Sequence, residues 1–86
     1  MPRQKIDVDI YKVIKPIKIN ETAICQIGDL LMIDESAYDG ASVSNLTQKW
    51  GFQCFGDYES VQLITKKTLT WDEYIAIYHG KKELIL

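Results

Sequence analysis

Apolar side chains in this chain gather in short runs that are separated by turn residues. The central run, residues 23–33, holds two apolar segments that meet at Gly28-Asp29. Such a run predicts the middle strand, or strand pair, of a small β domain. A hairpin turn and a bend in one strand are both compatible with Gly28-Asp29, and we favour the bend because the flanking arms are short.

Further strands are predicted on both sides of the central run. β-Branched residues are dense over about residues 8–15, and Pro16 marks the end of this strand because it cannot donate a ladder hydrogen bond. A later run over residues 58–65 also has the composition of a strand. The buried residues expected in that run are Val61, Leu63 and Ile64.

The C-terminal helix has the clearest start signal in the chain. Thr70 is a suitable N-cap, and Glu73 three residues later completes a capping box. Apolar residues then recur at helical spacing, and Gly80 supplies the left-handed stop. The pattern predicts a helix over residues 71–79 that covers one end of the β domain. The apolar tail after it, residues 84–86, is expected to add a strand or to meet a partner.

Together these elements predict a mainly β domain with one C-terminal α-helix. The Gly28-Asp29 step before an apolar run resembles the bend found in small SH3-like barrels. The resemblance implies a small antiparallel SH3-like or related barrel. The alternative is an open antiparallel sheet with the helix packed on one face. Residues 1–86 are expected to form a single domain, because a chain this short supports only one core.

Composition indicates a folded protein without a membrane segment. Apolar residues make up 47% of the chain and aromatic residues 10%, whereas a disordered chain is poorer in both. The sequence holds no apolar run near the roughly 20 residues that span a bilayer, and its polar start lacks a signal-peptide core. We therefore expect a cytoplasmic protein. Because a core of this size is small, a homodimer is considered as well.

The net charge of −2 conceals an acidic middle of the chain. Residues 20–60 hold seven carboxylates against Lys49 alone, whereas residues 1–19 carry a net +3. Residues 34–44 form the longest predicted loop, and long loops on small domains often carry contacts. These carboxylates either solvate turns or contact a partner. The candidate partner-binding residues are Asp34, Glu35, Tyr38, Asp39, Asp57 and Glu59.

Side chains for catalysis or metal binding are sparse. His79 is the only histidine, and it lies in the last turn of the predicted helix, where the dipole favours a cation. Cys25 and Cys54 lack metal-ligand spacing, so we expect free buried thiols, with a disulfide as the alternative. The sequence contains neither a glycine-rich phosphate loop nor a metal cluster. We predict no enzyme activity, no cofactor and no metal site.

Nucleic-acid binding is the alternative function. Residues 50–55 form a predicted aromatic strand that loosely resembles the base-stacking strands of cold-shock and OB domains. Acidic residues follow that strand, however, and core packing of Trp50 and Phe52 is the favoured interpretation. The lysines that could form a basic strip are Lys12, Lys15 and Lys18.

A non-enzymatic protein-binding module is the favoured function. An acidic middle suits a protein surface better than a phosphate backbone, because nucleic-acid binding depends on lysine and arginine side chains. The small size and the lack of an active-site set resemble the accessory proteins that phages and mobile elements encode. The resemblance implies action on a host nuclease or regulator, with carboxylates in a groove that otherwise takes nucleic acid.

Overall fold

The structure, a computed structural model, describes residues 5–34 and 41–84, without the side chains of residues 41 and 53–55. Strands make up most of the secondary structure in these ranges. The elements in chain order are β1 (Lys5–Val13), β2 (Ile17–Lys18), β3 (Ile24–Cys25), β4 (Leu30–Asp34), β5 (Ala41–Asn45), β6 (Trp50–Phe55), the 3-10 helix η1 (Tyr58–Ser60), β7 (Val61–Thr70) and α1 (Trp71–Tyr78).

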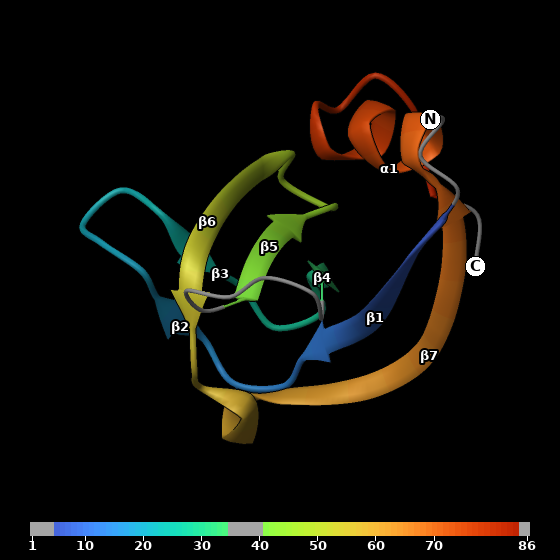
Figure 1. Cartoon of the computed structure of the whole chain (residues 1–86). Coiled ribbons are helices and arrows are strands. Elements are labelled where there is room, and N and C mark those ends of the chain that lie inside the picture. Colours follow the sequence, from blue (N-terminus) through green and yellow to red (C-terminus); the bar gives the residue numbers. More distant parts are fainter. Residues whose placement is uncertain (1–4, 35–40, 85–86) are drawn as a thin grey trace.

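Five strands form one antiparallel sheet in the order β6-β5-β4-β1-β7. β4, β5 and β6 follow one another as a meander, whereas β7 returns to pair with β1 (Figure 1). The short strands β2 and β3 pair with each other as a separate hairpin. Figure 1 shows that the sheet is strongly curved and that α1 lies across its open side, between β6 and the end of β7.

This architecture confirms the prediction of a mainly β, antiparallel fold with one C-terminal helix. The described strands do not close into a barrel, because β6 and β7 are the two edges of the sheet. The arrangement corresponds to the alternative, an open antiparallel sheet with the helix packed on one face. The relation to SH3-like barrels stays a prediction.

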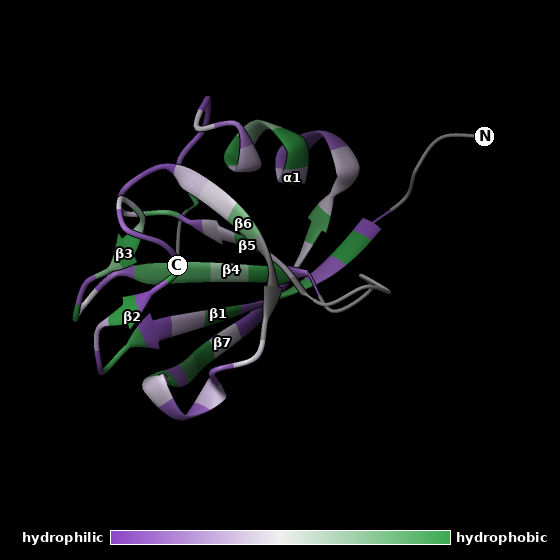
Figure 2. Cartoon of the chain, turned by 90° about the vertical axis from the view of Figure 1, so that its left-hand side faces the viewer, coloured by the Kyte–Doolittle hydropathy of each residue, from purple (hydrophilic) through white to green (hydrophobic). Residues whose placement is uncertain are grey.

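β1 is buried on opposite faces at its two ends. Its first half places Ile6, Val8 and Ile10 against α1, whereas its last residue, Val13, packs in a cluster on the other face. Side chains alternate along a strand, so the apolar residues of β1 change from even to odd positions between the two clusters. β4 lies beside β1 and is buried on both faces over residues 31–33, and Figure 2 shows its apolar colour.

Two apolar clusters therefore lie on opposite faces of the sheet. α1 covers one of them, the helix-side cluster, and the β2–β3 hairpin contributes to the other, the hairpin-side cluster. The helix-side cluster consists of Ile6, Val8, Ile10, Met32, Leu69, Tyr74 and Ile77. The hairpin-side cluster consists of Val13, Ile17, Cys25, Leu31, Ile33, Val43 and Val61.

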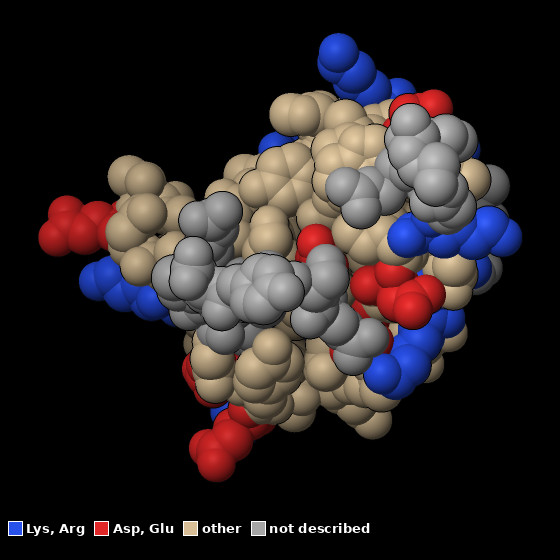
Figure 3. Space-filling view, viewed as in Figure 1, with Lys and Arg blue, Asp and Glu red and all other residues tan. Residues whose placement is uncertain are grey.

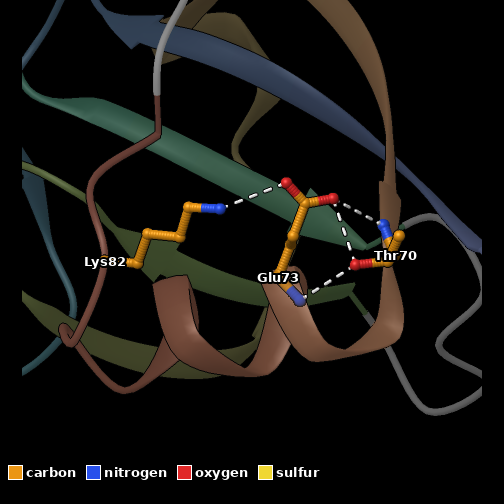
Figure 4. A network of polar contacts seen from close by, with 3 residues as sticks. All are labelled: Thr70, Glu73 and Lys82. Atoms are coloured by element: carbon orange, nitrogen blue, oxygen red, sulfur yellow. Dashed lines mark hydrogen bonds and ion pairs between the residues drawn. The ribbon is translucent and has the colours of Figure 1, made fainter.

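The two ends of α1 have the signals that the sequence predicts. The backbone N–H of Glu73 donates to the Thr70 hydroxyl at 3.2 Å, and the Thr70 N–H donates to the Glu73 carboxylate at 3.1 Å (Figure 4). The Thr70 N–H and the Lys82 ammonium, 3.2 Å from the other carboxylate oxygen, lower the pKa of Glu73. At the other end Gly80 has φ +73° and Lys81 N–H donates to the carbonyl of Ala76, which is a Schellman stop.

Gly51 lets α1 approach β6 closely. A Cβ at this position would lie 3.0 Å from the Tyr78 hydroxyl and 3.1 Å from the Val43 carbonyl oxygen. Both distances are shorter than an ordinary van der Waals contact, so a larger residue here would require Tyr78 or the backbone of Val43 to shift. The backbone of β6 therefore forms part of the surface on which α1 rests.

β1 begins earlier than the predicted range of residues 8–15. The polar residues Asp7 and Asp9 interrupt the apolar pattern, but each has a partner on β7. The Thr68 hydroxyl donates to Asp7 at 2.7 Å, and the Lys66 ammonium lies 3.1 Å from Asp9. Such cross-strand pairs stabilise a strand that the apolar pattern alone does not show.

Gly28-Asp29 forms a turn, so the prediction of a bent continuous strand is wrong. Asp29 N–H donates to the carbonyl of Gln26 at 3.0 Å, and Gly28 has φ +95°, a conformation that favours glycine. The turn connects β3 to β4, which belong to different sheets, so it is not a hairpin either. Residues 41–44, expected in a loop, belong to β5.

Candidate functional site

Three segments of the chain meet where β1 ends. On one side Val13 donates to the carbonyl of Asp29 at 2.9 Å and accepts from Gly28 N–H at 2.8 Å. On the other side Ile14 N–H donates to the carbonyl of Ser60 at 2.8 Å. The end of β1 is thus held between the Gln26–Asp29 turn and η1. Residues far apart in sequence are brought together at this end of the molecule.

This end collects the exposed large apolar side chains of the described residues. Ile27 and Ile14 lie on the two sides of the Val13 backbone, Tyr58 belongs to η1, and Leu63 and Ile64 follow in β7. The exposed fractions are 42% for Ile14, 64% for Ile27, 45% for Tyr58, 45% for Leu63 and 46% for Ile64. We call these five residues the apolar end. Exposed apolar side chains at one end of a molecule are typical of an interaction site.

The exposure of Leu63 and Ile64 contradicts their predicted burial. Leu63 pairs with Tyr11 of β1, but the next paired residue of β7 is Thr65, opposite Ile10. Ile64 is therefore the extra residue of a β-bulge, which interrupts the alternation of buried and exposed positions. β7 is also an edge strand, so no further described strand covers this part of it. Of the three residues expected in the core, only Val61 is buried.

Tyr58 is held in place by a ring contact with β1 and by a hydrogen bond between Asp57 and Ser60, which lie on either side of it in sequence. Its ring packs edge to face on Tyr11, with 5.8 Å between the ring centroids and an interplanar angle of 61°. The Ser60 hydroxyl donates to Asp57 at 2.8 Å, which fixes the start of η1. Asp57 and Glu59 are both exposed and flank Tyr58 in sequence. The apolar end therefore has a defined aromatic residue with two carboxylates beside it.

The six predicted partner-binding residues do not form one described surface. Asp57 and Glu59 lie at the apolar end. Asp34 is half-buried at the end of β4, opposite Val8, whereas the apolar end lies near Val13 at the far end of β1. Burial raises the pKa of Tyr74, and the carboxylate of Asp34 raises it further, which places Asp34 near α1. The remaining predicted residues, which lie outside the described residues, are Glu35, Tyr38 and Asp39.

Trp50 and Phe52, the aromatic residues of β6 whose side chains are described, do not form an open platform for bases. Trp50 and Phe52 are half-buried and pack on the hairpin-side cluster, with 5.6 Å between their ring centroids. The Trp50 indole N–H donates to Gln48 at 3.2 Å. This packing agrees with the interpretation of both residues as part of the core. The lysines of the predicted basic strip, all exposed, are Lys12, Lys15 and Lys18.

The described residues hold no set of side chains that fits nucleophilic or metal chemistry. Cys25 is fully buried, and desolvation raises the pKa of its thiol, so the thiolate is disfavoured. His79 is exposed as the C-cap of α1. Within the described ranges no three residues of the ligand types His, Cys, Asp and Glu come together. The side chain of Cys54 is not among those described.

A buried polar network behind the apolar end was not foreseen from the sequence. The Asp29 carboxylate accepts hydrogen bonds from Asn45 at 3.0 Å, Gln48 at 2.6 Å and the Gln26 N–H at 2.9 Å. Burial would raise the pKa of Asp29, but these hydrogen bonds outweigh it and lower the pKa. Because Asp29 closes the turn that carries Ile27, the network fixes one side of the apolar end. Polar residues spaced 16 and 19 positions apart give no local sequence signal.

The chain has no detected relative that assigns this surface a role. Among the described residues, no helix has the length and apolar character to cross a membrane. No protein-family model matches the chain, and searches of curated proteins and of solved structures find no similar protein.

Proposed function

We propose that the protein is a non-enzymatic protein-binding module that binds its partner through the apolar end and the carboxylates of Asp57 and Glu59. The observation that carries the proposal is the convergence of five exposed apolar side chains at one end of the molecule. Removing side chains of this kind from water lowers the free energy of the complex and so favours binding. The two carboxylates at the rim supply polar contacts that orient the partner.

A protein partner fits this surface better than a nucleic acid does. Phosphate binding draws its affinity from lysine and arginine, and the residues on both sides of Tyr58 are acidic. Base stacking also needs free aromatic faces, whereas Trp50 and Phe52 pack on the hairpin-side cluster. Tyr58 is the exposed aromatic residue at this end, and its ring is already in contact with Tyr11.

The finer predictions from the sequence belong to this proposal. The relation to SH3-like barrels is supported by the curved meander β4-β5-β6 and by β7, which follows the 3-10 helix η1 and returns beside β1. The role as a phage or mobile-element accessory protein rests on size and on the lack of an active-site set. The cytoplasmic location rests on the lack of an apolar run near the roughly 20 residues that span a bilayer. Both remain predictions.

Affinity capture with matched variants tests the proposal. The bait is the tagged full-length chain, incubated with lysate of the source cell, and the variants are Leu63→Lys and Glu21→Gln. Each substitution raises the net charge by one, but Glu21 is an exposed residue between β2 and β3, outside the apolar end. We expect a protein that wild type and Glu21→Gln retain and Leu63→Lys loses. Capture that is independent of Leu63, or micromolar binding of oligonucleotides that weakens steeply with salt, contradicts the proposal.

A further inference from the structure

Residues 57–67 carry charge in a fixed order over η1 and the following part of β7, which is the edge strand of the sheet. The segment begins with the carboxylates of Asp57 and Glu59, continues through apolar residues of β7, and ends with two lysines. The apolar residues in its middle are Val61, Leu63 and Ile64, and the lysines are Lys66 and Lys67. A segment that is acidic at one end, apolar in the middle and basic at the other complements itself when it is paired in the antiparallel direction.

The edge along which this segment runs has no second strand partner in the described part of the chain, and residues 67–69 line a hollow there together with residues 82–84. β7 pairs with β1 on one side, and no described strand lies on its other side. Backbone N–H and C=O groups on such an edge can pair with another strand. Lysines on an edge strand usually prevent this pairing. They attract an incoming segment, however, when that segment carries carboxylates at the matching positions.

We propose that a second copy of this chain occupies the edge, with its own β7 antiparallel to the first. The proposal rests on the protein-binding function above and names the partner. A two-fold axis near Leu63 and Ile64 brings these residues of both copies together, as in an isologous interface. The same axis brings Asp57 and Glu59 of each copy alongside Lys66 and Lys67 of the other. The exposed apolar residues of β7 and the charges at both ends of the segment then take part in one contact.

Two of the four charged residues are suited to substitution. Lys66 lies 3.1 Å from the buried carboxylate of Asp9, and Asp57 accepts a hydrogen bond from Ser60, so changing either disturbs the fold. Glu59 is exposed and Lys67 is half-buried. The test variants are therefore Glu59→Lys and Lys67→Glu. Glu59→Lys brings a lysine next to Lys67 of the other copy, and Lys67→Glu brings a carboxylate next to Glu59 of the other copy.

Sedimentation velocity on the full-length chain tests the proposal by charge exchange. Wild type is expected to dimerise, and each variant alone to self-associate at least about tenfold more weakly because like charges then meet. An equimolar mixture of the two variants is expected to recover the dimer, because opposite charges meet again at both contacts. Isotope labelling of one variant identifies the mixed dimer by native mass spectrometry. Circular dichroism of each variant checks that it is folded.

Matched controls separate this contact from general effects of charge. Glu21→Lys and Lys18→Glu make the same charge changes at exposed positions in and near the β2–β3 hairpin, and they should leave the dimer intact. The Leu63→Lys variant should be monomeric, and mixing it with either charge variant should not restore a dimer. A monomeric wild type, or a mixture that stays monomeric, overturns self-pairing. If wild type is monomeric but still captures another protein through Leu63, only the self-pairing proposal is contradicted. If capture does not depend on Leu63, the protein-binding proposal is contradicted as well.

Discussion

β7 contributes to both ends of the molecule, and its two halves differ in what covers them. Leu69, in the second half, is 7% exposed and packs beneath α1 with Tyr74 and Ile77. Leu63 and Ile64, in the first half, are nearly half exposed. The same strand thus supplies a core residue at the helix end and surface residues at the apolar end. α1 has eight residues, about 12 Å, so it can cover only one of the two ends.

The surface charges differ between these regions as well. Figure 3 shows that lysine and acidic side chains intermingle on the side of the molecule where β1 and β7 run together. The Asp9–Lys66 pair is one such contact, with the carboxylate buried and the ammonium exposed. At the helix end Lys82 and Glu73 form a second, exposed pair. The carboxylates of η1 lie instead beside exposed apolar residues, as expected for a surface that another molecule completes.

The largest expected difference between the two ends is the cost of shortening an apolar side chain. Ile10 is fully buried in the helix-side cluster, so Ile10→Ala should lower the free energy of unfolding by about 2 to 5 kcal/mol. Leu63→Ala should lower it by less than about 0.5 kcal/mol, because the side chain is already exposed. Urea denaturation at low protein concentration measures both without a contribution from association. Equal losses would show that Leu63 is covered in solution.

The helix end was predictable from sequence because its signals are local. Thr70 and Glu73 are three residues apart, and Gly80 follows the helix directly, so start and stop can be read within one short window. The predicted range of residues 71–79 differs from α1 by one residue, His79, which is the C-cap. The capping bonds and the left-handed glycine act between neighbours in sequence. Tertiary packing adds to them without changing where the helix begins.

The apolar end was not predictable because its composition depends on contacts between distant residues. A run such as Val61 to Ile64 has the composition of a buried strand, but burial depends on whether another element lies outside it. The bulge at Ile64 and the edge position of β7 are properties of pairing, which the run itself does not encode. Asp57 and Glu59 were selected by charge, and the sequence gives no sign that their helix η1 meets Ile14 at the end of β1.

The polar network behind the apolar end should contribute the next largest effect. Asp29→Ala removes the carboxylate acceptor of the Asn45 and Gln48 amides, which should cost about 1 to 3 kcal/mol. The pKa of Asp29 is lowered in the folded protein, so its stabilisation is complete above the unfolded pKa of about 3.9 and is lost as the pH falls through the lower, folded pKa. Denaturation between about pH 5 and pH 2 measures this loss.

Asp29→Asn removes the charge of the carboxylate but keeps a side chain of nearly the same size. The variant should show a smaller decrease in stability over the same acid range, because position 29 no longer titrates. Glu21→Gln removes an exposed carboxylate outside the network and should keep the wild-type slope. If Asp29→Asn keeps the wild-type slope too, other carboxylates cause the acid sensitivity.

Gly51→Ala tests the contact between α1 and β6, with an expected cost of about 1 to 3 kcal/mol from overpacking. The added methyl group would press on the Tyr78 hydroxyl and on the backbone of Val43. Gly56→Ala is the matched control, because a Cβ at Gly56 meets no atom of the described residues within 4 Å. Tyr78→Phe removes the hydroxyl, so in that background Gly51→Ala should cost less. An unchanged cost would place the strain at the Val43 carbonyl instead.

The smallest effect expected here is at the N-cap of α1, and it separates the two ends most cleanly. Thr70→Ala should lower the free energy of unfolding by about 1 kcal/mol, because the N–H of Glu73 loses its acceptor, whereas Thr70→Ser retains the hydroxyl and should stay near wild type. Thermal and urea denaturation measure the difference. Both variants should keep wild-type self-association and partner capture, since Thr70 lies at the opposite end of β7 from Leu63. If Thr70→Ala weakens binding while the protein remains folded, the two ends are coupled through β7, and the division of roles between them is wrong.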